Sequence, residues 1–306
     1  MLLLGTAVVV TGLTAETLYN GIVLPATWPP HRTLTNRTSL AAPWYTAAAG
    51  HPAAVIVDVG RQLLIDDFLI GGSSNATIVF HAPTLAEAAP GTYVGGAGLW
   101  WDSAAGHFKN FFTCTKSFRI HGDGALGPVC LQTSTDGVHW RNHTTPTGTN
   151  VVWDRPAFSR ALLLDELAPA AQRWKLAQVE FSNASYTGKE FKLVYQLYAS
   201  PDGLSWKRQS ATPGIDGGVG SPGDCSSAMI NPFRNVTVLS AKTTDSSLGR
   251  YRNYAEANAF SEESFSGDCF VPWAAADVDD PKWLGSVDSG GIEHYAAVPE
   301  LYNLDG

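Results

Sequence analysis

The feature that most limits how this chain can fold is a sequence pattern that occurs twice. Ser-X-Asp-Gly-X-X-Trp stands at residues 134–140 and again at residues 200–206, which places Asp136 and Asp202 66 residues apart. Asp-Gly between two runs of β-forming residues predicts a hairpin with a tight, primed turn, because glycine takes positive φ without strain. We therefore expect both aspartates to be turn residues and the chain to contain repeated hairpin units.

Each hairpin belongs to a longer unit, of which three copies are visible. Apolar runs end in Asp102 and Asp165, and each is followed by a second run of alternating residues that contains a lysine. A third unit, residues 228–241, has Asn231 at the corresponding position. Several short strands per unit, repeated at about 65 residues, are typical of the four-stranded blade of a β-propeller. We therefore predict an all-β chain that contains about three blades.

Composition favours β structure and argues against several other classes. The chain has 30 Gly, 18 Pro and 10 Trp, and 16% of its residues are charged, which excludes a disordered acidic chain and a helical array. The best helix candidate, residues 161–176, contains Pro169, so we expect a strand, a turn and a second strand there. A net charge of −8, with only 20 Lys and Arg, argues against nucleic acid and anionic membranes as partners.

The N-terminal segment and the glycosylation acceptors indicate the secretory pathway. Residues 1–15 are apolar and uncharged, are too short to span a bilayer, and fit a signal peptide cleaved after Ala15. A buried N-terminal strand is the alternative; after cleavage we expect no membrane insertion. The pattern Asn-X-Ser/Thr occurs at Asn36, Asn75, Asn142, Asn183 and Asn235. We therefore predict a secreted glycoprotein.

The cysteines favour disulfides over a metal site. The chain has four cysteines with no Cys-X-X-Cys spacing, and four cysteines allow three pairings that the sequence alone leaves open. Two matches to Gly-X-Gly-X-X-Gly, at residues 122–127 and 218–223, lack the strand and helix of a dinucleotide site and are expected to be loops. We expect neither a metal nor a cofactor.

The N-terminal segment and the repeat together divide the chain into three parts. These are a signal peptide at 1–15, an N-terminal arm with the first strands at 16–94, and a partial propeller at 95–306 with units at about 95–153, 154–223 and 224–304. Five blades of about 65 residues would need about 325 residues after the arm. We therefore expect a truncated product, or a propeller that another chain completes.

An acidic residue stands just before the first strand of each unit. Asp154 and Asp224 precede the second and third units, and Asp305 stands where a further unit would begin. The first strand of every propeller blade lines the central channel, so these carboxylates would converge at one mouth of the channel. We predict all three as catalytic residues, with a loop cap as the alternative for Asp154 and Asp224.

The acidic residues lie in segments that resemble a known superfamily. Gly223-Asp224-Cys225, followed by Met229-Ile230-Asn231-Pro232, looks like the invertase-type Arg-Asp-Pro segment. With the repeated hairpins, it makes the chain similar to the five-bladed β-propeller glycoside hydrolases, which include invertases and arabinanases. Residues 18–30, 57–70 and 299–306 look like an uncharacterised secreted branch of that superfamily, and the resemblance covers most of residues 18–306.

The resemblance implies hydrolysis of glycosidic bonds by carboxyl groups. One Asp acts as base or nucleophile, a second orients the sugar, and a Glu is the general acid; by motif position Asp224 would be the orienting residue. Asp224 lacks the flanking Arg and Pro, and the chain has neither an Asn-Asp-Pro-Asn motif nor a Glu-Cys pair. Asp66 and Asp67 form the nearest acidic pair early in the chain, with a charged strand end as the alternative.

Two functions from different classes therefore remain open. The first is a glycoside hydrolase that acts on a carbohydrate through paired carboxylates, and the second is a non-catalytic carbohydrate-binding or scaffold propeller. Four tryptophans could stack on a sugar ring: Trp100, Trp101, Trp153 and Trp273. Of these we predict Trp100 and Trp101 as substrate-binding residues, together with Arg155, which follows Asp154. Packing in the core of the blades is the alternative for the tryptophans.

Overall fold

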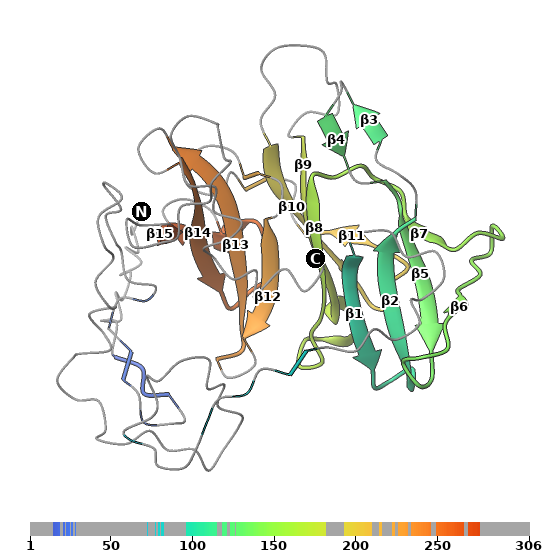
Figure 1. Ribbon diagram of the computed structural model, residues 1–306, viewed down its shortest axis with the longest axis horizontal. Coiled ribbons are helices and arrows are strands. Elements are labelled where there is room, and N and C mark those ends of the chain that lie inside the picture. The colour runs from blue at the N-terminus through green and yellow to red at the C-terminus, as the bar shows by residue number, and fades with distance from the viewer. Residues whose placement is uncertain are drawn as a thin grey trace, which may run out of the picture. The chain divides into compact units, whose positions relative to one another are not determined.

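The structure is a computed structural model, drawn in Figure 1. It describes short pieces between residues 15 and 82, and then residues 96–114, 118–120, 123–125, 127–181, 193–209, 214–215, 222–223, 226–231, 234–245, 249–265 and 269–275. Within these residues, no helix has both the length and the apolar character needed to cross a membrane.

The chain forms two compact units. The first comprises residues 1–31 and 40–82, and the second comprises residues 32–39 and 83–306. In the described part of the first unit, Thr17 and Val23 form an antiparallel bridge, and Leu24 is buried. All of the named strands belong to the second unit.

The second unit contains three antiparallel sheets whose strands follow chain order. The first consists of β1 (Gly96–Asp102), β2 (His107–Thr113), β5 (Val129–Ser134) and β6 (Arg141–Asn142), with β7 (Val151–Trp153) also paired to β5. The second consists of β8 (Ser159–Leu164), β9 (Trp174–Phe181), β10 (Leu193–Ser200) and β11 (Lys207–Arg208). The third consists of β12 (Ser227–Asn231), β13 (Val236–Asp245), β14 (Gly249–Ala257) and β15 (Val271–Ala275). A short hairpin joins β3 (Phe118–Ile120) to β4 (Asp123–Ala125).

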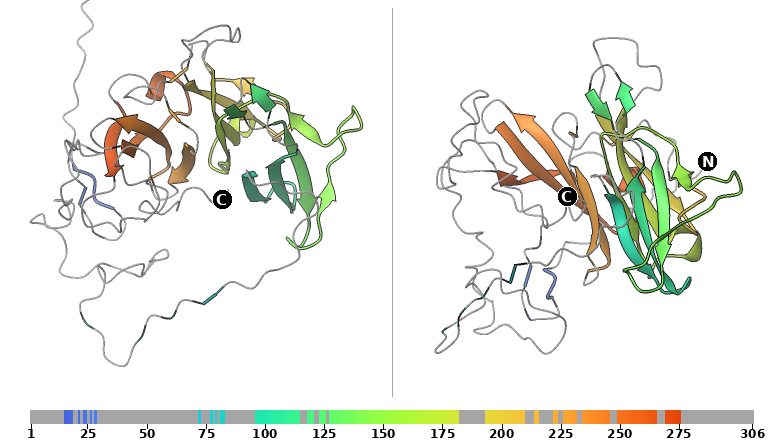
Figure 2. Two further views of the ribbon diagram at one scale, coloured as in Figure 1. Left: turned by 45° about the horizontal axis from the view of Figure 1, so that its top comes forward. Right: turned by 45° about the vertical axis from the view of Figure 1, so that its right-hand side comes forward.

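The first strands of the three sheets are neighbours. β8 contacts β1 and also contacts β12, and Figure 2 shows the green, yellow-green and orange sheets side by side in that order. Apart from strands, the regular structure of the described residues consists only of short 3₁₀ turns, among them η2 (Ala170–Gln172) and η3 (Glu263–Phe265). The all-β class is therefore confirmed, while the number of blades and the closure of a propeller stay predictions.

Two apolar clusters hold the sheets together, one on each face of the second sheet. Leu176 and Tyr198 belong to the cluster shared with the first sheet, while Ala177 and Leu197 belong to the cluster shared with the third. β9 and β10 are consequently buried along almost their whole length. A strand that is covered on both faces carries apolar residues in sequence rather than in alternation.

Residues 161–176 form the strand, turn and strand that Pro169 predicts. β8 ends at Leu164, η2 occupies the connection after Pro169, and β9 begins at Trp174. The amide of Asp165 donates to the carbonyl of Arg173, which closes the hairpin directly beyond β8.

The two Ser-X-Asp-Gly turns are hairpins, but they are longer than the tight primed turn that the sequence predicts. Six residues separate β5 from β6, and six separate β10 from β11. In the first turn, Ser134 Oγ accepts from the amide of Gly137 at 2.9 Å, and Asp136 Oδ1 accepts from the amide of His139 at 2.8 Å. The side chains of Ser134 and Asp136 thus satisfy backbone amides that would otherwise pair across the strands in a two-residue turn. Within the two turns, only Gly137 and Gly203 have positive φ.

One disulfide lies in the described residues. Cys114 and Cys130 are bonded with their Cα atoms 5.4 Å apart, which selects one of the three pairings that the sequence leaves open. In that pairing the partner of Cys269 would be Cys225, which lies outside the described residues.

Replacing Cys114 and Cys130 together by serine is expected to lower the free energy of unfolding by about 2–3 kcal/mol. The bridge joins cysteines 16 residues apart in sequence and restricts the unfolded chain accordingly. Urea denaturation followed by tryptophan fluorescence measures the change. Adding a reductant should destabilise the native protein more than the double variant, which keeps only the Cys225–Cys269 pair. If the reductant lowered the stability of the native protein and of the double variant equally, the Cys114–Cys130 disulfide would not be the one that stabilises the fold.

Candidate functional site

The candidate site lies at the loop that leads from β7 into β8. Asp154 is on this loop and is exposed. Asp224 and Asp305, the other two predicted catalytic residues, lie outside the described residues, as do Asp66 and Asp67. The convergence of three carboxylates at one channel mouth therefore stays a prediction.

Arg155, the predicted substrate-binding residue beside Asp154, connects the loop to the second sheet. Its Nη1 donates to the hydroxyl of Tyr198 at 2.9 Å, and its Nη2 lies 3.5 Å from Oε2 of Glu180. Its guanidinium also lies 5.7 Å from the centre of the Tyr198 ring, within the range of a cation–π contact. The Arg155 side chain is 47% exposed, so this group of residues reaches solvent through the arginine.

Glu180 is the buried carboxyl group of the site. Its side chain is 9% exposed, and the hydroxyl of Tyr198 donates to its Oε1 at 2.5 Å. Burial raises the pKa of Glu180, although the Tyr198 hydrogen bond and Arg155 act in the opposite direction. A carboxyl group with a raised pKa keeps its proton to a higher pH than an exposed carboxyl group does, and it can donate that proton.

A second arginine supports the loop from inside. Arg160 is buried on β8; its Nη1 donates to the carbonyl of Gly127 at 2.7 Å and its Nη2 to the carbonyl of Arg155 at 3.0 Å. Burial lowers the pKa of Arg160 to about 10, and the charge of Glu180 opposes that shift. Arg160 therefore remains charged at neutral pH and fixes the backbone that carries Arg155.

Aromatic rings form one side of the site. The ring centre of Trp153, at the end of β7, lies 4.7 Å from that of Tyr198 and 6.3 Å from that of Trp206. The indole nitrogen of Trp153 donates to Oε1 of Gln178 at 3.1 Å, which fixes the ring. Trp153 is partly buried, and its ring and the Arg155 guanidinium both lie against the ring of Tyr198.

The register of the second sheet explains why these residues meet. Ser159 at the start of β8 pairs with Val179, so Glu180 lies just beyond the paired region, beside the loop of residues 154–158. Sequence analysis did not identify Glu180 as a site residue. The available signal was its place on the same alternation as Leu176, since that alternation puts a carboxyl group on a buried face.

Trp100 and Trp101, the other predicted binding residues, lie near the opposite end of the second sheet. The indole nitrogen of Trp100 donates to the carbonyl of Leu162 at 2.7 Å, and its ring packs against both apolar clusters. Trp101 is 46% exposed and contacts Phe108. Asp102, the next residue, pairs with Arg173, which stands just before the start of β9. Arg155 instead pairs with Glu180, near the end of β9. The structure therefore does not bring the two tryptophans to Asp154.

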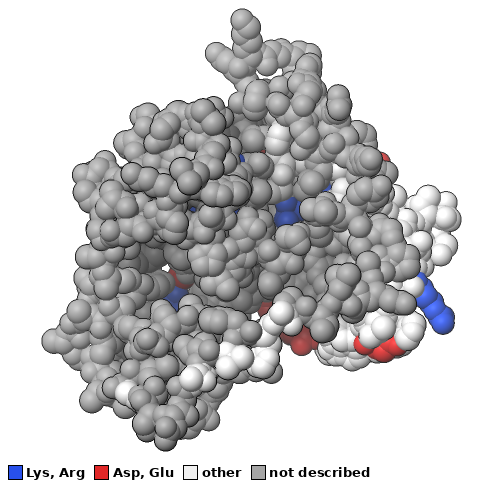
Figure 3. Space-filling view, in the orientation of Figure 1, with Lys and Arg blue, Asp and Glu red and all other residues white. Residues whose placement is uncertain are grey.

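The site carries both signs of charge. On the face drawn in Figure 3, the described Lys, Arg, Asp and Glu side chains are scattered, with no continuous basic area among them. The described residues also contain no group of three or more His, Cys, Asp or Glu placed to hold a metal ion. The chemistry that these side chains offer is proton transfer and hydrogen bonding.

Comparison with known proteins gives structural likeness only. No family model matches the chain, and no curated protein matches it. An N-acetylgalactosamine deacetylase from F. plautii, solved with blood group B trisaccharide, is 17% identical, with a TM-score of 0.33 over 62% of this chain and 51% of that one. A fructofuranosidase variant from Schwanniomyces occidentalis, complexed with fructosylnystose, is 16% identical, with a TM-score of 0.28 over 61% of this chain and 47% of that one. The same fructofuranosidase with fructose gives 16% identity and a TM-score of 0.25, over 60% and 47% of the two chains. This chain thus spans about half the length of the solved structures that it matches.

Proposed function

We propose that the three sheets are consecutive blades of a five-bladed β-propeller and that the chain is a glycoside hydrolase. Two observations support the propeller: the strands of each sheet follow chain order, and the first strands of neighbouring sheets are in contact. The repeated units and the resemblance to invertases and arabinanases agree with it. The observation that carries the activity is the buried carboxyl group of Glu180, which is held by Tyr198 and by Arg155, the residue that follows Asp154.

Glycoside hydrolysis needs two carboxyl groups in different protonation states. Glu180 would be the general acid, since burial raises its pKa and favours the protonated form. The exposed Asp154 would supply the second carboxyl group, with Asp224 and Asp305 as further candidates outside the described residues. Arg155 and the face of Trp153 would hold the sugar, the first by hydrogen bonds and the second by stacking.

The secretory pathway is part of the proposal. Two of the five glycosylation acceptors, Asn142 and Asn235, lie in the described residues, and both are exposed. Exposure is what the glycosylation machinery requires of an acceptor asparagine. Expression in a eukaryotic secretory host, followed by deglycosylation and mass measurement, tests this part separately.

The Glu180→Gln variant is expected to lose at least about a hundredfold in kcat/KM on any glycoside that the native protein hydrolyses. Glutamine keeps the shape and can still accept the Tyr198 hydrogen bond, but it has no proton to donate as an acid. A panel of fructans, arabinans and aryl glycosides supplies the substrate. Glu166→Gln is the matched control, because Glu166 is an exposed residue on the connection between β8 and β9.

The pH profile gives an independent measurement. A general acid works only while it is protonated, so the activity of the native protein should fall as the pH rises through the raised pKa of Glu180. The position of that alkaline limb should move when Arg155→Met removes a charge that opposes the shift. Full activity of Glu180→Gln, or an unchanged alkaline limb in Arg155→Met, would remove Glu180 from the mechanism.

A specific observation also favours the second function, carbohydrate binding without hydrolysis. Both oxygens of Glu180 are engaged, one by Tyr198 and the other by Arg155, an arrangement that can serve to fix the loop alone. In that case the native protein would bind glycans from the panel without cleaving them. Trp153→Ala would then weaken binding, while Glu180→Gln would leave it unchanged.

A further inference from the structure

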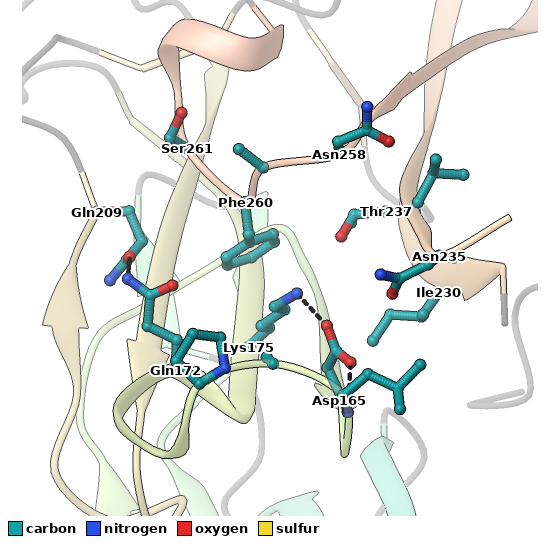
Figure 4. Close-up of a pocket in the computed structure, with 15 residues that line it drawn as sticks. Asp165, Gln172, Lys175, Gln209, Ile230, Asn235, Thr237, Asn258, Phe260 and Ser261 are labelled. Atoms are coloured by element: carbon teal, nitrogen blue, oxygen red, sulfur yellow. Dashed lines mark hydrogen bonds and ion pairs between the residues drawn. The ribbon is translucent and has the colours of Figure 1, made fainter.

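A cavity of about 430 Å³ lies between the second and third sheets, away from Glu180. Figure 4 shows Asp165 and Lys175 pointing toward one another at its wall, with Phe260 beside the lysine. Asp165 Oδ2 and Lys175 Nζ are 2.5 Å apart, and both residues are buried. The cavity therefore has a buried ion pair in its lining.

An ion pair of the same kind lies between the first and second sheets. Asp102 Oδ2 lies 3.0 Å from Lys109 Nζ, and Lys109 Nζ lies 4.9 Å from the centre of the Trp174 ring. A second cation completes this arrangement, because Nη2 of Arg173 donates to Asp102 Oδ1 at 2.9 Å. Arg173 lies between η2 and β9, on the hairpin of the neighbouring sheet, and is the second cation on Asp102.

The registers show which residue of the third sheet corresponds to Arg173. Arg173 pairs with Asp165 beyond the end of β8, and in the third sheet Val236 pairs with Asn231 at the end of β12. Val236 lines the cavity and has neither the length nor the charge to reach Asp165. The repeat therefore places an aspartate, a lysine and a valine where the first interface has an aspartate, a lysine and an arginine.

The other components of the arrangement are retained at the cavity. Lys175 Nζ lies 5.4 Å from the centre of the Phe260 ring, as Lys109 lies over Trp174. Asp165 Oδ1 accepts from the amide of Leu167 at 3.1 Å, as Asp102 Oδ1 accepts from a backbone amide. Within the described residues, Lys175 is the one cation in contact with Asp165.

We propose that this cavity binds a small organic cation, whose guanidinium or ammonium group takes the place on Asp165 that Arg173 takes on Asp102. The lining otherwise carries uncharged hydrogen-bonding groups that can hold the body of such a ligand. These are the side chains of Gln172, Gln209, Thr237, Asn258 and Ser261. A neutral ligand would leave Asp165 without a second cation, so charge is the expected basis of recognition.

Saturation-transfer NMR on the full chain tests the proposal with methylguanidinium and its neutral isostere methylurea. We expect methylguanidinium to bind at least about tenfold more tightly than methylurea, because a charge-assisted hydrogen bond on a buried carboxylate is lost in the neutral compound. Val236→Arg should abolish binding, since the new side chain supplies the guanidinium itself. Val138→Arg is the matched control, because Val138 is an exposed residue of the turn between β5 and β6.

Three results would overturn the proposal. These are equal binding of the two compounds, binding that persists in Val236→Arg, and binding that is lost equally in Val138→Arg. If Val236→Arg does not fold, Ala259→Arg replaces it, because Ala259 lines the same cavity and is exposed. The outcome is independent of hydrolysis, because none of these variants touches Glu180 or Arg155.

Discussion

The Asp102→Ala variant is expected to lose about 3–5 kcal/mol of the free energy of unfolding. Asp102 is 1% exposed and pairs with both Lys109 and Arg173, which are themselves largely buried. Removing the carboxylate leaves two cations in a space that water barely reaches, and this costs more than the loss of an exposed ion pair. Lys109 retains a hydrogen bond to the carbonyl of Asp202, which limits the loss.

Chemical denaturation followed by the fluorescence of the ten tryptophans measures this change. Asp154→Ala is the control, since Asp154 is exposed and its loss should change the stability by no more than about 0.5 kcal/mol. Equal midpoints for the two variants would show that the buried ion pairs contribute little.

The pH dependence of the Asp102 effect has a defined sign. Burial opposes ionisation of Asp102, but Lys109 and Arg173 outweigh it and hold its pKa below the ordinary value of 3.8. Its contribution to stability is therefore present above that value and is lost as the pH falls through the lowered pKa. The difference between the native protein and Asp102→Ala should accordingly shrink in acid.

Local chemistry made much of the fold predictable. Pro169 alone argued against a helix over residues 161–176, and the Asp-Gly pairs marked both hairpins. The length of the turns was not predictable from glycine conformation, because Ser134 and Asp136 satisfy the turn amides with their side chains. An all-β class needs only such local signals, whereas blade number depends on contacts between whole sheets.

The candidate site was predictable only in part. The repeat placed Asp154 and Arg155 directly before a first strand, where the structure has them. Glu180 could not be identified in this way, because its pKa is raised by burial, and that burial depends on how distant segments of the chain pack around it. The position of Trp100 was not predictable for the same reason, because its hydrogen bond to Leu162 joins the first sheet to the second.

The Gly203→Ala variant is expected to lose about 2–5 kcal/mol of the free energy of unfolding, for two separate reasons. Gly203 has a φ of 79°, a conformation that costs an L-residue roughly 1–2 kcal/mol. A Cβ atom at this position would also lie 2.9 Å from Phe111 Cζ and 3.5 Å from Trp174 Cδ2. Phe111 and Trp174 are fully buried, so neither ring can move aside without disturbing the core, and overpacking costs about 1–3 kcal/mol more.

The repeat supplies a matched control that separates the two causes. Gly137 occupies the same place in the first turn, with a φ of 75°, but a Cβ atom there would lie 3.4 Å from Phe108 Cε2 and 3.7 Å from Cδ2. Gly137→Ala should therefore show mainly the backbone cost, roughly 1–2 kcal/mol. Equal losses in the two variants would assign the whole effect to the turn conformation. A larger loss in Gly203→Ala would show that the second hairpin is set against the core that joins the first and second sheets, and the first hairpin is not.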